Sequence, residues 1–500
     1  MYCSTEAFQH FFETLEFHKD ENNNVLLLDP SVRIYCNADV DAICAAEIFK
    51  KLFYLKHKIW SIKPIRSSED FDIRDRQPSP LAKSLRAIIL LNFGGDIDLG
   101  RFFDLSSHPN LIVYVLDSQN PINLKNMYKT NHNIFIVLDN INSPENRDII
   151  EKSESKELAG QKDNNYEMVG GYLVITDDFG RPIRKHWTAI DKPIPLATGP
   201  ARRCNHGSSI ALQTYTLAST ILSNDNDMLW LAIIGHTSLF VSKKINLVEY
   251  NKMIGFLDAE VMGLNNSDGV QRIHRHKAVP AHSDDKRIIR INEYPLYTLF
   301  IINFHVYKII QISLTLLIIT YQCVLIGHWT LYDSMLNSEY TFNKMRLKEN
   351  QAANLDRLLR NIGITHRMAK QNFPSMDVQV ANSLAEMIKE EGPKFGLEYP
   401  LYSSYCKFYG YKQPSLSASD AAYGLITLLS TKKSASIEFG VEVRWVSDFG
   451  DDDSWLNNFY TVMEALDSRT GTSLLQSGID LRKVLQPLFI QGGANEFYIL

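Results

Sequence analysis

The chain has 500 residues, of which 45% are hydrophobic and 11% aromatic. Its net charge is −5, because it contains 52 Lys and Arg residues and 57 Asp and Glu residues. This apolar content excludes a largely disordered chain, and the length predicts about two to four domains. The acidic balance excludes a protein that coats nucleic acid by bulk charge. The six cysteines form no Cys-x-x-Cys pair, so neither a zinc ribbon nor a disulfide framework is expected.

The first part of the chain alternates predicted strands and helices. Residues 32–36 form a strand-like run, and the apolar residues between Ala42 and Phe53 recur with the spacing of one helix face. Three further apolar runs, at 87–91, 111–116 and 133–138, are continuous rather than alternating. Continuous runs suit strands that are covered on both faces, so we predict an α/β fold with a doubly wound parallel sheet.

The rest of the chain changes character several times. Residues 141–205 are polar and rich in acids and prolines, which predicts a linker or a surface insertion. Helical spacing returns at 209–222 and 227–234, and residues 334–396 are helical throughout. After a Tyr- and Ser-rich region at 399–419, read as turns, helices are predicted at 420–429 and 457–467, and a strand-like end at 488–500.

One apolar segment, residues 299–327, contains Lys308 as its only charged residue. Its length would allow it to span a bilayer, which takes about 20 apolar residues. His305 and two glutamines interrupt the segment, and neither flank has a clear excess of basic residues. A membrane span is therefore one hypothesis for this segment, but not the favoured one.

Acidic residues follow the predicted parallel strands, at the sheet edge where open α/β folds place their sites. Asp39 and Asp41 follow the first strand, Asp96 and Asp98 the second, and Asp117 the third. Carboxylates that converge there could hold two divalent metals for phosphodiester hydrolysis. Asp39 and Asp41 also stand where a helix cap and a first-turn acid belong, and the spacing alone favours this capping role.

A basic segment around Arg272, Arg275 and Lys277 could contact a phosphate backbone. No aromatic residue is interleaved for base stacking, so a solvated loop is the favoured interpretation. The chain has no phosphate-binding loop of the G-x-x-x-x-G-K-[ST] type, no G-x-G-x-x-G, no H-E-x-x-H and no G-x-S-x-G. ATP-binding, dinucleotide-binding, zincin and serine-hydrolase functions therefore lose their main support.

Several runs, taken in order, resemble the cell division control protein 45 family of eukaryotic replication factors. They are NADVDAICA at 37–45, IILLNFG at 88–94, VLDS at 115–118, HGSS at 206–209, NDMLWLAIIG at 226–235, HWTLYDS at 328–334 and SDA at 419–421. Their order and spacing agree with the family over most of residues 25–500. The runs at 226–235 and 328–334 are the specific ones, whereas D-V-D-A alone is not.

That family is similar to the DHH phosphoesterases, whose type member is the RecJ nuclease. The resemblance implies a DHH-like α/β domain, an all-α insertion domain and a C-terminal DHHA1-like α/β domain. Active DHH enzymes need the first-strand acids, an Asp-His-His triplet and a later aspartate. Here Asp39, Asp41 and Asp117 remain, but Ser118 and Gln119 replace the histidines and Ser238 stands at the later position. The resemblance thus implies a degenerate remnant, with no catalytic residue, metal or cofactor expected.

The function implied by the resemblance is a scaffold in DNA replication initiation and elongation. The family binds the MCM helicase ring and the GINS complex on chromatin in the nucleus. Contact with single-stranded DNA at the fork is a further expectation, for which Arg272, Arg275 and Lys277 are weak candidates. No membrane partner is expected. The alternative function is a metal-dependent DHH-family phosphoesterase or single-strand exonuclease.

The resemblance also suggests a domain plan. We expect the first part of the DHH-like domain at 1–140, a polar linker or insertion at 141–205 and the remainder of that domain at 206–298. An apolar insert at 299–326 is followed by the helical insertion domain at 327–398 and a truncated DHHA1-like start at 399–500. Tyr294 and His328 are separated by 33 residues here but lie close in sequence in the family, so we expect the insert, of the kind a retained intron encodes, to loop out.

Overall fold

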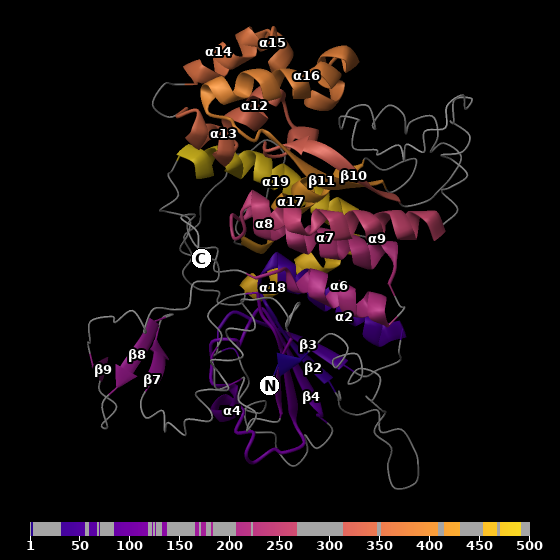
Figure 1. Ribbon diagram of the computed structural model, residues 1–500, viewed down its shortest axis with the longest axis vertical. Coiled ribbons are helices and arrows are strands. Elements are labelled where there is room, and N and C mark those ends of the chain that lie inside the picture. Colours follow the sequence, from indigo (N-terminus) through magenta and orange to yellow (C-terminus); the bar gives the residue numbers. More distant parts are fainter. Residues whose placement is uncertain are drawn as a thin grey trace. The chain divides into compact units, whose positions relative to one another are not determined.

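The structure, a computed structural model, shows two compact units, residues 1–224 and 225–500. It describes residues 2–3, 32–55, 60–67, 70, 85–118, 123, 126, 133–137, 166–169, 172–176, 182–183, 207–221, 224–267, 314–347, 352–408, 415–430, 454–467 and 471–491. Figure 1 labels their helices and strands. The basic candidates Arg272, Arg275 and Lys277 lie outside these residues, as does Gln119.

The first unit is built on a six-stranded parallel sheet in the order β1-β6-β5-β4-β2-β3. Its strands are β1 (Tyr2–Cys3), β2 (Val32–Asn37), β3 (Trp60–Ile65), β4 (Ala87–Leu91), β5 (Ile112–Leu116) and β6 (Ile134–Val137). Four of the six strands coincide with the apolar runs of the sequence. β1 and β3 were not predicted, because the alternating or polar content of their segments lacks that signal.

Both faces of this sheet are covered. On one face, alternate residues of β4, β5 and β6 pack with the short helix α4 (Leu99–Phe102) and the chain after it, in a cluster that includes Ile88, Leu90, Val113, Val115, Ile134, Ile136 and Phe103. Helix α2 (Val40–Leu55) packs against β2 and β4, and α6 (Ile210–Thr220) packs on α2. The predicted α/β fold with a doubly wound parallel sheet is therefore confirmed.

A small antiparallel sheet lies within the predicted linker at 141–205. It consists of β7 (Tyr166–Val169), β8 (Tyr172–Thr176) and β9 (Pro182–Ile183), paired in chain order. The polar composition of this segment predicted a connection without strands, so the hairpin between β7 and β8 was not predicted. The Gly170-Gly171 pair between the two strands is the signal that could have revealed it.

The second unit begins with three helices, α7 (Asn226–Val241), α8 (Leu247–Lys252) and α9 (Ile254–Ser267). They accompany an antiparallel sheet of β10 (Leu314–Tyr321), β11 (Leu401–Phe408) and β12 (Leu416–Ser417). Helices α7 and α9 pack against this sheet. The boundary between the two units lies after Asn224, and the predicted domain limits stay predictions.

The apolar segment at 299–326 does not loop out over its described part. Residues 314–321 form β10, which pairs with β11 along its whole length, with Ile318 opposite Ser404. Ile318 is 1% exposed and Tyr321 is 4% exposed. The looped-out insert is therefore wrong for residues 314–326, because β-branched and apolar side chains find a partner strand that is distant in the sequence. Residues 299–313 lie outside the described ranges.

No helix in the described parts of the chain has the length and apolar content to cross a membrane.

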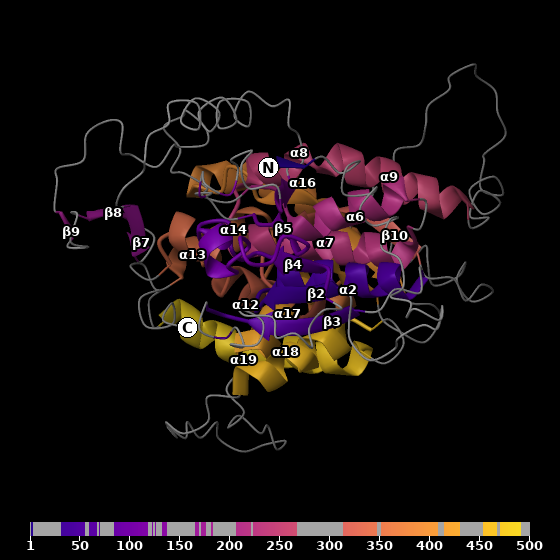
Figure 2. The same cartoon turned by 90° about the horizontal axis from the view of Figure 1, so that it is seen from below.

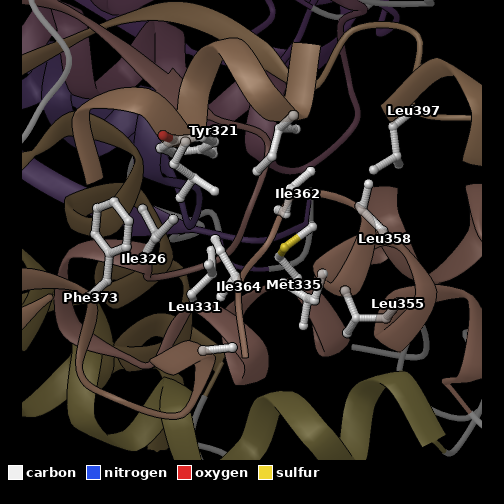
Figure 3. Packing of buried hydrophobic residues seen from close by; sticks show 14 of the residues in the cluster. Tyr321, Ile326, Leu331, Met335, Leu355, Leu358, Ile362, Ile364, Phe373 and Leu397 are labelled. Carbon is white, nitrogen blue, oxygen red and sulfur yellow. The ribbon is translucent and has the colours of Figure 1, made fainter. Parts of the chain in front are cut away.

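A cluster of short helices follows β10, as the sequence predicted. They are η5 (Ile326–His328), α12 (Leu331–Leu336), α13 (Glu339–Lys344), α14 (Ala353–Asn361), α15 (His366–Ala369), η6 (Phe373–Ser375), α16 (Val378–Glu391) and η7 (Gly392–Phe395). Figure 3 shows their shared core, which contains Leu331, Met335, Leu355 and Leu358. Tyr321 at the end of β10 packs into the same core and meets Phe373 edge-on. The apolar segment therefore contributes to the core of the helical cluster.

The last elements are α17 (Ala418–Ser430), α18 (Ser454–Ala465) and α19 (Thr472–Gln491). These three helices pack on one another, and Figure 2 shows them side by side. Two predictions are wrong here. Residues 401–408 are strand β11 rather than turns, and the predicted terminal strand is helical as far as Gln491, because tertiary packing on α17 outweighs the local apolar pattern.

A buried ion pair joins β11 to the first turn of α7. The side chain of Lys407 is 1% exposed, and its Nζ lies 2.6 Å from Oδ1 of Asp227. The same ammonium group lies 5.9 Å from the ring centroid of Trp230, within the range of a cation–π contact. A buried cation needs such partners because burial without them is costly. The pair therefore ties the antiparallel sheet to the helix whose sequence, NDMLW, supplied one of the specific motifs.

Candidate functional site

The sheet order of the first unit defines where a site would lie. β2 stands between β3 and β4, so the chain first moves to one side of β2 and then crosses to the other. Open α/β sheets bind ligands beyond the carboxyl ends of their strands at such a reversal, which here is the edge formed by the ends of β2 and β4. Asp39 follows β2, Asn92 follows β4, and Asp117 and Ser118 follow β5. Sequence-predicted acids and two uncharged polar residues are thereby brought together at this edge.

Asp39 caps helix α2. Its Oδ1 accepts a hydrogen bond from the backbone N–H of Ala42 at 2.9 Å, and its carbonyl accepts from Ile43 at 3.0 Å. The amide Nδ2 of Asn92 lies 3.2 Å from each carboxylate oxygen of Asp39. An N-terminal cap of this kind contributes about 1 kcal/mol to helix stability. The predicted capping role of Asp39 is confirmed.

Asp41 is the first-turn acid of α2, as predicted, but its carboxylate forms its hydrogen bonds with another helix. Its carboxylate accepts hydrogen bonds from the hydroxyl of Ser209, from the N–H of Ile210 at 3.0 Å and from the N–H of Ala211 at 3.1 Å. These donors belong to the N-terminus of α6, which lies 168 or more residues further along the chain. Asp41 therefore caps α6 rather than α2, and it joins the first helix of the sheet to the last helix of the unit.

Burial shifts the proton affinity of Asp41. The residue is 1% exposed. Desolvation and the nearby charge of Asp39 raise its pKa to about 6, while the bonds from Ser209, Ala211 and Ile210 act in the opposite direction. A carboxyl group that is removed from water and lies beside a negative charge holds its proton more tightly. The carboxyl group of Asp41 is therefore largely protonated in mildly acidic solution, below about pH 6.

Asn92 connects Asp39 to Ser118 through its side-chain amide, and it was not among the predicted site residues. The residue is 3% exposed and has a positive φ of 50°. Its Oδ1 accepts from the backbone N–H of Ser118 at 3.0 Å and from the Ser118 hydroxyl at 2.8 Å, while its Nδ2 donates to Asp39. Asn tolerates left-handed backbone better than most residues. The sequence signal that could have identified this residue is an Asn that follows a buried strand and stands shortly before Gly94 and Gly95.

Asp117 and Ser118 accept hydrogen bonds from backbone N–H groups of two other segments, at Gly95 and Gly207. Oδ2 of Asp117 accepts from the N–H of Gly95 at 3.0 Å, and a Cβ on Gly95 would lie 2.9 Å from that oxygen. The carbonyl of Ser118 accepts from the N–H of Gly207 at 2.6 Å. Ser118 stands where the DHH resemblance places a histidine, and its hydroxyl is committed to Asn92. Both residues therefore hold backbone in place.

The other predicted residues form hydrogen bonds within their own units. Asp98 caps the short helix α4 through the N–H of Arg101, and Asp96 meets Asn123 through its backbone carbonyl. Ser238 lies in the second unit, inside α7, and its hydroxyl donates to the carbonyl of Gly235 at 2.7 Å. The later acid of DHH enzymes is thus replaced by a serine that bonds its own helix.

His236, two residues before Ser238, is also buried in the second unit. Its ring stacks on Tyr250 at 4.9 Å, and its Nε2 lies 3.1 Å from the carbonyl of Tyr250. Because a carbonyl only accepts, Nε2 carries the proton. Burial lowers the pKa of His236 to about 4, so the imidazole is neutral at physiological pH. The residue belongs to the aromatic core that also contains Phe240 and Tyr402.

The donor set of the cluster does not fit a two-metal centre. Both oxygens of Asp41 accept backbone N–H groups, one oxygen of Asp117 does the same, and serine replaces a histidine ligand. Within the described ranges, no group of three or more His, Cys, Asp or Glu side chains is arranged to hold a metal ion. The carboxylates at this sheet edge therefore act as acceptors that join α2, α6 and the strand-end loops.

Replacing Asn92 tests whether this hydrogen-bond hub stabilises the unit. Asn92→Ala leaves the buried N–H and hydroxyl of Ser118 without their acceptor, so we expect a loss of about 2–4 kcal/mol in the free energy of unfolding. Asn92→Gly makes the same deletion but relieves the left-handed backbone, and should lose about 1 kcal/mol less. Urea unfolding of the full chain measures both. A change below about 0.5 kcal/mol for Asn92→Ala would contradict the assignment.

The chain matches a family model and is similar to several known proteins in sequence and in structure. The model of the CDC45 family matches residues 32–169 and 201–495. The chain is similar to the cell division control protein 45 homologue of Homo sapiens, with 24% identity over 461 residues, covering 90% of this chain and 71% of the relative. The homologue of Schizosaccharomyces pombe is 25% identical over 514 residues, covering 93% and 74%. The crystal structure of CDC45 from Entamoeba histolytica aligns with a TM-score of 0.63 at 16% identity, covering 98% of this chain and 74% of that one.

Proposed function

Since the chain belongs to the CDC45 family, a family of DNA replication factors, we propose that it acts in the nucleus as a non-catalytic scaffold of the replicative helicase. The proposed partners are the MCM ring and the GINS complex. The observation that carries the non-catalytic part is the use of Asp39, Asp41 and Asp117 as hydrogen-bond acceptors within the first unit.

The alternative function, a metal-dependent phosphoesterase, has less support. A two-metal mechanism needs ligands that hold both ions and polarise the attacking water. Here Ser118 and Ser238 take two of the expected ligand positions, and each hydroxyl is bonded to a neighbour. Residues Arg272, Arg275 and Lys277 remain the proposed contacts for single-stranded DNA.

Co-purification with MCM and GINS subunits tests the scaffold. The tagged full chain, expressed with untagged partner subunits, should retain both complexes through size-exclusion chromatography. The double variant Asp39→Asn, Asp41→Asn keeps the shape of the carboxylates and removes their charge, so it should retain the partners as well. Failure of the wild-type chain to retain either complex would contradict the proposed function.

A nuclease assay addresses the alternative separately. We expect no cleavage of end-labelled single-stranded DNA by the purified chain with Mg²⁺ or Mn²⁺ above the level seen with a chelator. The reason is that the ligand positions are filled by serine and by committed carboxylates. Metal-dependent cleavage that disappears in the Asp39→Asn, Asp41→Asn variant would show that the site is an active centre.

A further inference from the structure

The helical cluster of the second unit separates its charges. From Arg357 to Met376 the chain carries four fixed cations and no acid. The cations are Arg357, Arg360, Arg367 and Lys370, and all are exposed, as is His366. The acids gather instead on α16, at Glu386, Glu390 and Glu391. These five basic residues of α14 and α15 are called the basic face below.

Helix geometry brings the two halves of the basic face together. Leu355, Leu358 and Leu359 are the buried side of α14, which turns Arg357 and Arg360 outward. In α15 Ala369 is buried, and His366 and Lys370 share the opposite side at i and i+4. The two helices pack on each other, with Nδ1 of His366 lying 3.8 Å from Oδ1 of Asp356 in α14. The cations of both helices therefore form one patch.

This patch has little internal compensation. Asp356 is the acid beside the face: its Oδ1 lies 3.8 Å from Nδ1 of His366, which forms an ion pair with it only in the protonated state. Within the described residues, none of Arg357, Arg367 and Lys370 pairs with an acid. Exposed cations at this spacing repel one another weakly in water, and a run of carboxylates placed across them would relieve that repulsion.

Tyr332 of α12 lies beside the patch and helps to identify its partner. The ring of His366 meets it edge-on at 4.7 Å, and Nζ of Lys370 stands 5.6 Å from the ring centroid. Burial raises the pKa of Tyr332, and the charges of Asp356 and Asp333 act in the same direction. With one ring face under a lysine, Tyr332 is not an open platform for a nucleic-acid base.

We propose that the basic face docks a short acidic segment of a partner protein. Helix α14 is nine residues long, or about 14 Å, so the four cations match a run of a few carboxylates. Binding of single-stranded nucleic acid instead combines basic groups with aromatic rings on which bases stack, and the ring of Tyr332 beside this face is covered by Lys370. The proposal concerns a surface outside the strand-end cluster and does not depend on binding to MCM or GINS.

The test uses the full chain and a fluorescein-labelled twelve-residue peptide containing six Asp or Glu residues. A peptide with Asn and Gln at those positions is the probe control. We expect fluorescence anisotropy to detect binding of the acidic peptide only, with an affinity that falls as salt is raised. The variant Arg357→Glu, Arg367→Glu should bind about tenfold more weakly, or worse, because each reversal replaces an attraction by a repulsion.

A matched variant separates local charge from net charge. Lys344→Glu, Lys389→Glu changes the net charge equally at exposed sites outside α14 and α15, and should alter affinity less than about twofold. Asp356→Asn removes the charge of the acid that lies beside His366 and should tighten binding about two- to threefold. Circular dichroism and thermal melting confirm that each variant folds.

Three results would overturn the proposal. They are absence of binding by the acidic peptide, equal weakening by the two double variants, and tighter binding of a labelled oligothymidine that is lost in the Arg357→Glu, Arg367→Glu variant. The last result would assign the face to nucleic acid. Retained acidic-peptide binding in a chain that fails to co-purify with MCM and GINS would leave this inference standing while the proposed function fails.

Discussion

Ile318→Asp is expected to abolish folding of the second unit. Ile318 is 1% exposed in the middle of β10, opposite Ser404, which is itself fully buried. An unpaired carboxylate at this position costs more than about 4 kcal/mol, a large part of the stability of an ordinary domain. Limited proteolysis with mass spectrometry should show rapid cleavage between residues 225 and 491 in the variant, with wild-type fragments persisting.

Ile318→Val is the matched control. It removes one methylene group without adding charge and should cost about 0.5–1.5 kcal/mol, leaving the proteolytic pattern close to wild type. The same argument applies to deletion of residues 300–324, which removes the whole of β10 and should also expose the unit. Normal folding of either Ile318→Asp or this deletion would show that β10 is dispensable and would restore the looped-out insert that the sequence suggested.

Asp41→Ala should destabilise the first unit by about 2–4 kcal/mol at pH 5. The substitution leaves the Ser209 hydroxyl and the N–H groups of Ile210 and Ala211 without an acceptor inside the protein. Each unpaired buried donor costs about 1–3 kcal/mol, and the net loss is smaller than the sum because the substitution also removes the desolvation cost of the buried carboxyl group. This exceeds the loss expected from an ordinary helix cap because the donors are buried. Urea unfolding followed by circular dichroism and fluorescence measures the change.

The loss of stability caused by Asp41→Ala depends on pH, because the pKa of Asp41 rises on folding from 3.8 to about 6. The folded chain binds the proton more tightly, so the stability from this group is present below about pH 4 and is lost as the pH rises through 6. Between pH 5 and 7.5 the wild-type chain should lose about 1.4 kcal/mol from this residue. The loss caused by Asp41→Ala should be smaller at pH 7.5 by the same amount.

Asp41→Asn isolates the charge from the hydrogen bonds. The amide keeps one acceptor oxygen for α6 and cannot ionise, so the variant should lack the wild-type loss of stability between pH 5 and 7.5. Other titrating groups are common to both proteins and cancel in the comparison. Parallel pH profiles for wild type and Asp41→Asn would contradict the burial of a titrating carboxylate at this site.

Sequence patterns predicted the parallel sheet of the first unit well. Continuous apolar runs mark strands that are buried on both faces, and this signal is local, so β2, β4, β5 and β6 could be placed without any tertiary information. The motifs at 226–235 and 328–334 likewise indicated the family that the comparisons established. The capping role of Asp39 was predictable because an N-cap and its helix are adjacent in the chain.

The remaining features depend on partners that are distant in the chain. Asp41 has the same local context as Asp39, yet it binds α6, and no spacing rule connects residues 41 and 211. The apolar run at 314–321 could be a membrane span, a loop or a strand, and its pairing with residues 401–408 decided the outcome. Hydrophobicity and propensity are properties of a segment and belong to the sequence by itself. Strand partners and the acceptors of buried donors are properties of the folded chain, so only the tertiary structure decided them.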